Sequence, residues 1–275
     1  MITYIINFLI IILAAINYFT ITIVFYLLKN LYCTKYIFNL IVNLLTNFSI
    51  FFLQYLSIFW KIKLQKLNID SEKILVNCNH TGAIDDILTL VVLKKIIKNF
   101  DFKLTRSVSN LSSEIEEGVF NFIDSIVIND KILFQEIDKK LNHLVNSYEN
   151  LYLIFFLEGA KDQSYNRLMQ NKFKIKLKNL NFPKTLLFNT VCEKNYFDYL
   201  LDINVIYSYQ GKIVSGELDF KYYLDKNMKA NVKINIYKMP KENYEEWLFN
   251  LYRKKDICLE NIKKDINNTI RWKLL

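Results

Sequence analysis

Two long uncharged stretches at the start of the chain place the strongest limit on how this sequence can fold. Met1–Leu28 contains no charged residue, and Tyr36–Trp60 is a second uncharged segment. Each stretch is long enough to form a membrane helix. The first lacks the basic start and the small-residue cleavage site of a signal peptide, so we expect it to be retained. The pattern predicts two membrane-embedded helices within residues 1–60, as a hairpin or re-entrant pair whose second helix need not span fully.

Composition and charge agree with a membrane-bound protein that handles anionic ligands. The 275 residues are 52% hydrophobic and 15% aromatic, with a net charge of +9. On so apolar a chain, a basic surface indicates anionic lipid or a phosphorylated substrate rather than nucleic acid. The four cysteines have no paired spacing, as expected of reduced thiols facing the cytosol. Two histidines are too few for a His-rich metal cluster, so we predict no metal site. We expect no cofactor either.

From Ser71 onward, short apolar runs alternate with helical patterns, which indicates an α/β domain over residues 61–238. We expect a mixed sheet with flanking helices and, over residues 239–275, a charged helical tail. Helices are expected after Ala83, after Ser112, around Leu133–Tyr148 and over Glu242–Trp272. The strand candidates are Ile74–Val76, Phe102–Thr105, Phe122–Ile128, Leu151–Leu157, Thr185–Phe188, Asn204–Tyr209 and Val232–Tyr237.

The stretch ILVNCNHTGAIDDILTL, from Ile74 to Leu90, carries the clearest chemical pattern. An apolar strand passes through polar residues into a helix, which places His80 on the connecting loop. Asp85 follows five positions later, close enough for its carboxylate to bond one imidazole nitrogen. Such a carboxylate fixes the tautomer and leaves the other nitrogen free as a general base. A capping or hydrogen-bonding pair at a helix start is the alternative, and His143, in a charged helical stretch, is expected on the surface.

A basic segment, Arg167 to Lys178, follows the strand candidate at Leu151–Leu157. Lysine recurs there at Lys172, Lys174, Lys176 and Lys178. Two interpretations stay open: a solvated helix face, or a surface for lipid or nucleotide phosphates.

Several blocks of this sequence, in order, resemble the PlsC-like glycerolipid acyltransferases. Asn79-His80-Thr81-Gly82-Ala83-Ile84-Asp85 looks like their NHxxxxD block, and Phe156-Leu157-Glu158-Gly159-Ala160-Lys161 resembles their FPEGTR block. Gly118 to Asn129 resembles the middle block of the family. Leu186 to Thr190 and Asp202 to Tyr207 resemble the two later blocks. The C-terminal stretch WLFNLYRKKDICLENI, residues 247–262, resembles the tail of the family branch that contains lysocardiolipin, lysophosphatidylinositol and some lysophosphatidate acyltransferases.

The resemblance implies transfer of a fatty acyl group from acyl-CoA to a free hydroxyl of a lysophospholipid, without a covalent acyl-enzyme. It implies that His80 is the base and that Asp85 orients it and balances its charge. The residues that the resemblance assigns to substrate binding are Asn79, Glu158, Gly159, Lys161 and Thr190. The expected partners are acyl-CoA, lysophospholipid and membrane lipids, with no nucleic acid and no specific protein. The expected location is the endoplasmic reticulum membrane, with the catalytic domain facing the cytosol.

The sequence also departs from the family pattern at residues expected to bind phosphate. The Pro, Thr and Arg of the FPEGTR block are Leu157, Ala160 and Lys161 here, so a charge is kept but the bidentate fork is lost. The arginines of two other blocks align with Asp130 and Asn189. These losses motivate an alternative function: a catalytically silent lipid-binding or membrane-scaffold protein on the same fold. A lipid hydrolase is a third possibility, although no Ser nucleophile elbow is present.

Overall fold

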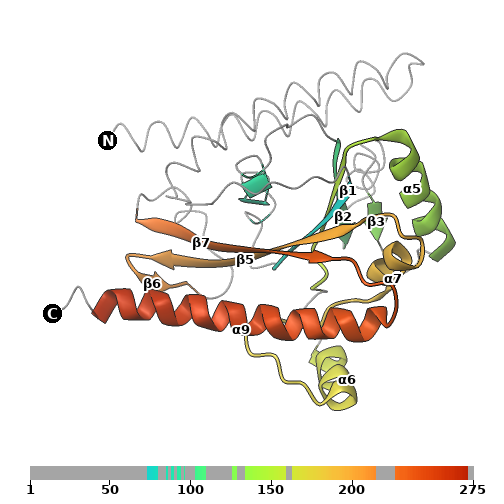
Figure 1. Cartoon of the computed structure of the whole chain (residues 1–275). Helices are drawn as coiled ribbons and strands as arrows, with labels where there is room; N and C mark the ends of the chain where they lie inside the picture. The colour runs from blue at the N-terminus through green and yellow to red at the C-terminus, as the bar shows by residue number, and fades with distance from the viewer. Residues whose placement is uncertain are drawn as a thin grey trace, which may run out of the picture.

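The computed structural model describes residues 73–79, 85, 88, 89, 92, 93, 96, 103–109, 126–128, 134–158, 163–214 and 227–271. Their helices and strands form one α/β unit (Figure 1). In chain order the elements are β1 (Lys73–Cys78), β2 (Lys103–Ser109), β3 (Ile126–Ile128), α5 (Phe134–Ser147), β4 (Leu151–Phe155), α6 (Gln163–Phe173), α7 (Leu186–Glu193), β5 (Tyr199–Tyr209), β6 (Lys212–Ile213), β7 (Met228–Lys238) and α9 (Tyr244–Arg271).

The described strands form a mixed sheet, as the sequence predicts, and this sheet has seven strands. The order is β3-β2-β4-β1-β5-β6, and β7 pairs with β5. The first five strands are parallel: β2 pairs with β3 and β4, and β1 lies between β4 and β5. The strands β6 and β7 run antiparallel to β5. Because β4, β1 and β5 are adjacent and parallel, their carboxyl ends lie at one edge of the sheet, where α/β proteins commonly place their sites.

Both faces of the sheet are buried, which explains why its central strands read as continuous apolar runs. On β1, Ile74, Val76 and Cys78 enter one hydrophobic cluster, together with Leu88 and Val92 from helical positions after the strand. Alternate residues face the other way, into a cluster built with α5, α7 and α9. We call these the first face and the α9 face of the sheet.

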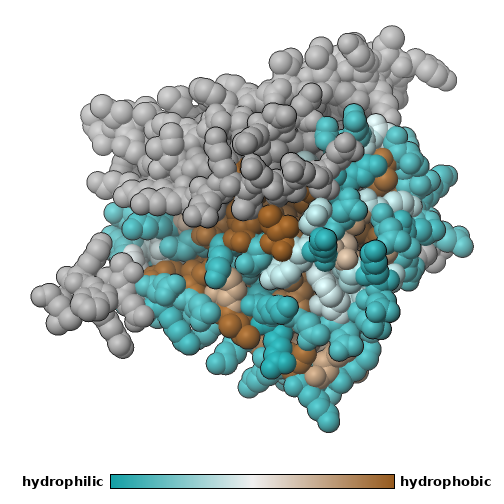
Figure 2. Space-filling view, in the orientation of Figure 1, coloured by the Kyte–Doolittle hydropathy of each residue, from teal (hydrophilic) through white to brown (hydrophobic). Residues whose placement is uncertain are grey.

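Helix α9 covers the α9 face lengthwise, along β5 and β7, with α6 on its outer side (Figure 1). Its buried residues recur at helical spacing, which makes it part of the core. Trp247, near its start, stacks on Phe188 of α7 with ring centroids 5.6 Å apart. In the view of Figure 2, hydrophilic residues dominate the surface of the described elements, with separate hydrophobic patches between them.

Most strand and helix predictions are confirmed where the structure describes them, and one is wrong. The predicted strand at Thr185–Phe188 is a helix: Thr185 precedes α7, which continues to Glu193. Buried residues at Leu187, Phe188, Val191 and Cys192 follow a helical repeat. Four consecutive apolar or β-branched residues fit either a strand or a buried helix. The spacing of the buried residues that follow them determines which of the two forms.

The predicted membrane helices within residues 1–60 lie outside the described residues. So do the helix expected after Ser112 and the first residues of the strand expected at Phe122–Ile128. Of the helix expected after Ala83, six positions are described, and all six are helical. Within the part of the chain that the structure describes, no helix is both long and apolar enough to cross a membrane.

Candidate functional site

Two of the predicted site residues lie just beyond the carboxyl ends of β1 and β4, which are adjacent parallel strands. Asn79 directly follows β1. Glu158 lies just beyond the end of β4, which is the strand next to β1. Glu158 also forms an antiparallel bridge with Pro183, which fixes the chain after β4. His80 follows Asn79 in the chain, but it lies outside the described residues, as do Gly159 and Lys161.

Asn79 holds the end of β1 against β5. It is 1% exposed, and its side-chain amide donates to the carbonyl oxygen of Val205 at 3.0 Å. Its amide oxygen accepts from the backbone N–H of Val205 at 2.8 Å. Both partners are main-chain groups, so the side chain replaces the peptide pairing that β1 would supply if it continued. These two bonds give Asn79 a structural role, because they fix the chain at the end of β1 against β5.

Asp85 is fully buried on the first face of the sheet. The hydroxyl of Tyr207, on β5, donates a hydrogen bond of 2.7 Å to its Oδ1. The hydroxyl of Thr89 donates to its backbone carbonyl at 2.7 Å, one helical turn along. The carboxylate is therefore held in a fixed orientation by a residue from the sheet. Burial, followed by the nearby charge of Asp85, raises the pKa of the Cys78 thiol.

A second polar cluster lies on the α9 face. The Lys255 ammonium donates to Asp202 Oδ1 at 2.6 Å and to the Ile203 carbonyl at 2.8 Å. Asp202 also accepts from the side-chain amides of Asn77 and Asn204, each at 2.9 Å. Both charged side chains are almost completely buried, at 0% and 1% exposed. A buried ion pair whose carboxylate accepts further hydrogen bonds links α9 to the middle of the sheet.

Glu158 and Thr190, the other predicted site residues that the structure describes, lie on the α9 side of the sheet. Glu158 acts electrostatically on Tyr252 of α9: burial first, and then the Glu158 charge, raise the pKa of that phenol. Thr190 is buried in α7, and its hydroxyl donates to the carbonyl of Leu186 one turn earlier, at 2.9 Å. The structure thus places Asn79 at the end of β1 and Glu158 just beyond the adjacent strand β4, whereas Asp85 lies in the helix after β1, on the first face of the sheet beside Tyr207. It places Thr190 within the helix layer on the α9 face.

Sequence reasoning missed the two residues that hold the acidic side chains, Tyr207 and Lys255. Tyr207 belongs to an apolar strand, where its hydroxyl gives no periodic signal. The burial of Lys255 could have been predicted from the sequence, because this lysine lies on the apolar stripe of α9 between Tyr252 and Leu259. A lysine on a buried stripe requires a buried partner, and Asp202 is the acidic residue inside the apolar run of β5.

Among the described residues, no group of three or more His, Cys, Asp or Glu side chains is arranged to hold a metal ion. His143 is exposed on α5, as expected. The described cysteines, Cys78, Cys192 and Cys258, are buried, and burial raises the pKa of each thiol. Thiols of this kind are poor nucleophiles, because the thiolate is the reactive form.

Comparison with known proteins does not assign this chain to a family, so its function must be argued from its own residues. No protein-family model matches the chain, and no curated protein sequence matches it. What remains is a buried aspartate in the helix after β1, which is held by a tyrosine of the neighbouring strand β5.

Proposed function

We propose that this protein is a membrane-bound acyltransferase that moves a fatty acyl group from acyl-CoA to the free hydroxyl of a lysophospholipid. In this proposal His80 is the general base and Asp85 orients it. The proposal rests on the sequence blocks around Asn79 and Glu158 and on one structural observation, the buried Asp85–Tyr207 hydrogen bond.

That hydrogen bond supports the role of Asp85 because an orienting carboxylate must itself be rigid. One oxygen of Asp85 is fixed by Tyr207 at 2.7 Å, and the side chain is excluded from water. The residue sits six positions after Asn79, which the sheet holds through Val205. Both ends of the segment from Asn79 to Asp85 are therefore anchored to β5, which limits where the histidine between them can lie.

In the proposed reaction, one proton passes from the acceptor hydroxyl to His80 and then to the departing CoA. His80 takes the proton of the acceptor hydroxyl as its oxygen attacks the thioester carbonyl, forming the new C–O bond. The tetrahedral intermediate then breaks its C–S bond, and the departing thiolate of CoA receives the proton from His80. Asp85 stabilises the imidazolium formed between the two steps. No oxidant, metal or covalent acyl-enzyme is needed.

Direct transfer also agrees with the state of the described cysteines. A covalent thioester intermediate on the enzyme needs an accessible thiolate with a normal or lowered pKa. Cys78 is the described cysteine next to Asp85, yet it is fully buried and its pKa is raised. Its position suits core packing rather than nucleophilic attack.

A catalytically silent lipid-binding protein is the second candidate, and Asn189 favours it. Asn189 stands where the family resemblance leads us to expect a phosphate-binding arginine. Its Oδ1 is buried and has no hydrogen-bond partner within the described residues. A neutral amide cannot supply the bidentate, charged contact of an arginine, so binding of a simple phosphate head group is weakened.

The test is a transfer assay with the full chain in detergent, labelled oleoyl-CoA and a panel of lysophospholipids. The panel contains lysophosphatidate, lysophosphatidylinositol, lysophosphatidylglycerol and lysocardiolipin, with His80→Ala assayed in parallel. We expect label to enter a phospholipid with one CoA released per ester, and His80→Ala to lower turnover by about 10²–10⁴-fold. Folded protein that transfers label to none of them, yet binds lipid equally with and without His80, establishes the silent alternative. Release of free fatty acid instead identifies a hydrolase.

Tyr207→Phe tests the specific geometry with little change in volume. Loss of the hydroxyl removes a hydrogen bond to Asp85, so the carboxylate becomes a stronger acceptor and the imidazolium is more stable. We expect kcat to fall and the acid limb of the pH–rate profile to move to higher pH. The matched control is Tyr196→Phe, which removes a hydroxyl bonded to Asp138 at 3.1 Å, away from Asp85. A Tyr207→Phe profile that coincides with the Tyr196→Phe profile contradicts the role given to Asp85.

A further inference from the structure

A basic groove lies between residues 173–178 and the side of α9, on the outer surface of that helix. Its volume is about 730 Å³. The cationic side chains that line it are Lys174, Lys176, Lys178, Arg253 and Lys264. All are exposed, and none has a carboxylate partner within the described residues. Unpaired positive charge around a concave surface concentrates anions there.

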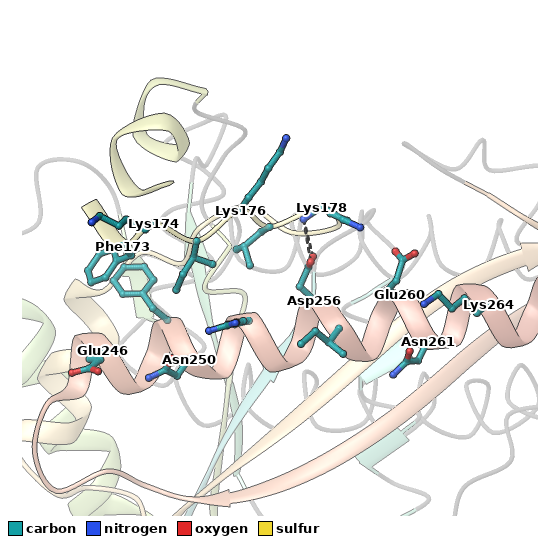
Figure 3. Close-up of a pocket in the computed structure, with 15 residues that line it drawn as sticks. Phe173, Lys174, Lys176, Lys178, Glu246, Asn250, Asp256, Glu260, Asn261 and Lys264 are labelled. Carbon is teal, nitrogen blue, oxygen red and sulfur yellow. Dashed lines mark hydrogen bonds between the residues drawn. The ribbon is translucent and has the colours of Figure 1, made fainter. Parts of the chain in front are cut away.

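The lysines line up because the segment from Lys174 to Lys178 alternates charged and apolar residues. Ile175 and Leu177 face inward and pack in the cluster that includes Phe249 of α9. The lysines between them are exposed. Figure 3 shows this segment running along α9, with Asn250, Asp256 and Lys264 on the helix beside it. The apolar residues hold the segment in place, and the lysines are left on its outer side.

Asp256 fastens this segment to the helix without neutralising a lysine side chain. Its carboxylate accepts the backbone N–H of Lys178 at 3.1 Å (Figure 3). It also accepts the backbone N–H of Asn179 at 2.7 Å. The Lys263 ammonium donates to Asn179 Oδ1 at 2.5 Å, which adds a second tie. The acidic residues that also line the groove, besides Asp256, are Glu246 and Glu260. Cations therefore remain in excess, on a wall that is already ordered.

We propose that this groove is a binding site for a phosphorylated ligand of nucleotide size. Its volume falls in the range of about 300–1,000 Å³ typical of small-molecule sites. Its apolar part includes Ile257, which is 55% exposed, and the partly exposed ring of Phe173, which packs on the buried Phe249 with ring centroids 4.0 Å apart. A planar ring can rest on Ile257 and Phe173 while its phosphates meet the lysines, and the amide of Asn250 can bond the ring edge. The site is separate from the Asp85 cluster and does not rest on acyl transfer.

Titration calorimetry of the full chain in uncharged detergent tests the proposal. The probes are ATP, adenosine 3′,5′-bisphosphate, inorganic phosphate and vesicles that contain phosphatidylglycerol. The groove variant is Lys174→Gly, Lys176→Gln and Lys178→Gln together. The control changes the three exposed lysines of β7 to Gln, namely Lys229, Lys233 and Lys238, and loses the same net charge.

Lys174→Gly keeps the groove variant foldable. Lys174 directly follows α6 with φ of 52°, a left-handed conformation that glycine adopts without steric cost. We expect the groove variant to bind a nucleotide at least tenfold more weakly than the wild type, and the β7 control to match the wild type. Equal weakening in both variants overturns the proposal, because the binding is then diffuse. So does groove-dependent binding of vesicles or of inorganic phosphate without binding of either nucleotide.

Discussion

The ion pair between Lys255 and Asp202 gives the sharpest test of how α9 is joined to the sheet. The two side chains lie 2.6 Å apart and are shielded from water. Replacing Lys255 with Met keeps the length and apolar stem of the side chain while removing its charge. Asp202 then loses its cationic partner and keeps, among the described residues, the side-chain amides of Asn77 and Asn204 as donors.

The expected loss follows from leaving a charge buried. Removing one member of a buried ion pair costs about 3–5 kcal/mol in unfolding free energy. Two amide donors still serve Asp202, so we expect Lys255→Met to lie near the lower end, about 3 kcal/mol. Asp202→Asn leaves the ammonium with the Ile203 carbonyl as its remaining acceptor among the described residues and should cost at least as much. The double variant removes both charges and should lose at least about 2 kcal/mol less than the sum of the single losses.

Chemical denaturation of the full chain in detergent, followed by tryptophan fluorescence, measures these losses. Trp247 stacks on Phe188, so its emission reports the detachment of α9 from α7. Lys194→Met is the matched control, since the Lys194–Asp138 pair is partly exposed, at 45% and 26%, and such pairs contribute about 0–1 kcal/mol. A Lys255→Met loss no larger than that of Lys194→Met, or strictly additive losses in the double variant, would refute the reasoning.

Two further predictions use the same unfolding assay. Asn79→Ala leaves the N–H and carbonyl of Val205 without their partners and should cost about 2–4 kcal/mol; a loss below about 1 kcal/mol contradicts the strand-end role. Burial, and then the charge of Glu193, raise the pKa of Cys192 from 9.0 to about 12, so the folded protein holds this proton where the unfolded chain has lost it. Stability should therefore be intact below pH 9 and fall between pH 9 and 12, and Cys192→Ala should flatten the curve in that interval.

The sheet was largely predictable because its signals are local. Leu151–Phe155 is apolar at every position and flanked by helical patterns, which marks a parallel strand buried on both faces. The error at Thr185–Phe188 has the same origin, since a short apolar run has no period of its own. Only the continuation through Val191 and Cys192, which bury on the same side of α7, distinguishes the helix.

The candidate site was predictable in part, because its members come from distant parts of the chain. Asp85 was identified from its spacing to His80 and from the resemblance of that block. Its partner Tyr207 is 122 residues away, and the contact exists only because β1 and β5 pair in a particular register. No local pattern encodes that register. For the pair of Lys255 and Asp202, the sequence shows a lysine on an apolar helical stripe, which indicates a buried ion pair. The stripe does not indicate which acidic residue is the partner.

The two polar clusters lie on opposite faces of the sheet, yet the same two strands carry both. On β1 and β5, Asn77 and Asp202 are register partners that face α9, whereas Tyr207 faces Asp85 from the other side. Between them, the Asn79 side chain fixes the end of β1 to Val205. A shift of α9 that pulled on Asp202 would therefore move the strand that positions Tyr207. If the proposed acyl transfer holds, a Lys255→Met variant that stays folded should show the same direction of pH–rate shift as Tyr207→Phe, only smaller. A loss of stability with an unchanged profile would mean that the two faces are mechanically independent.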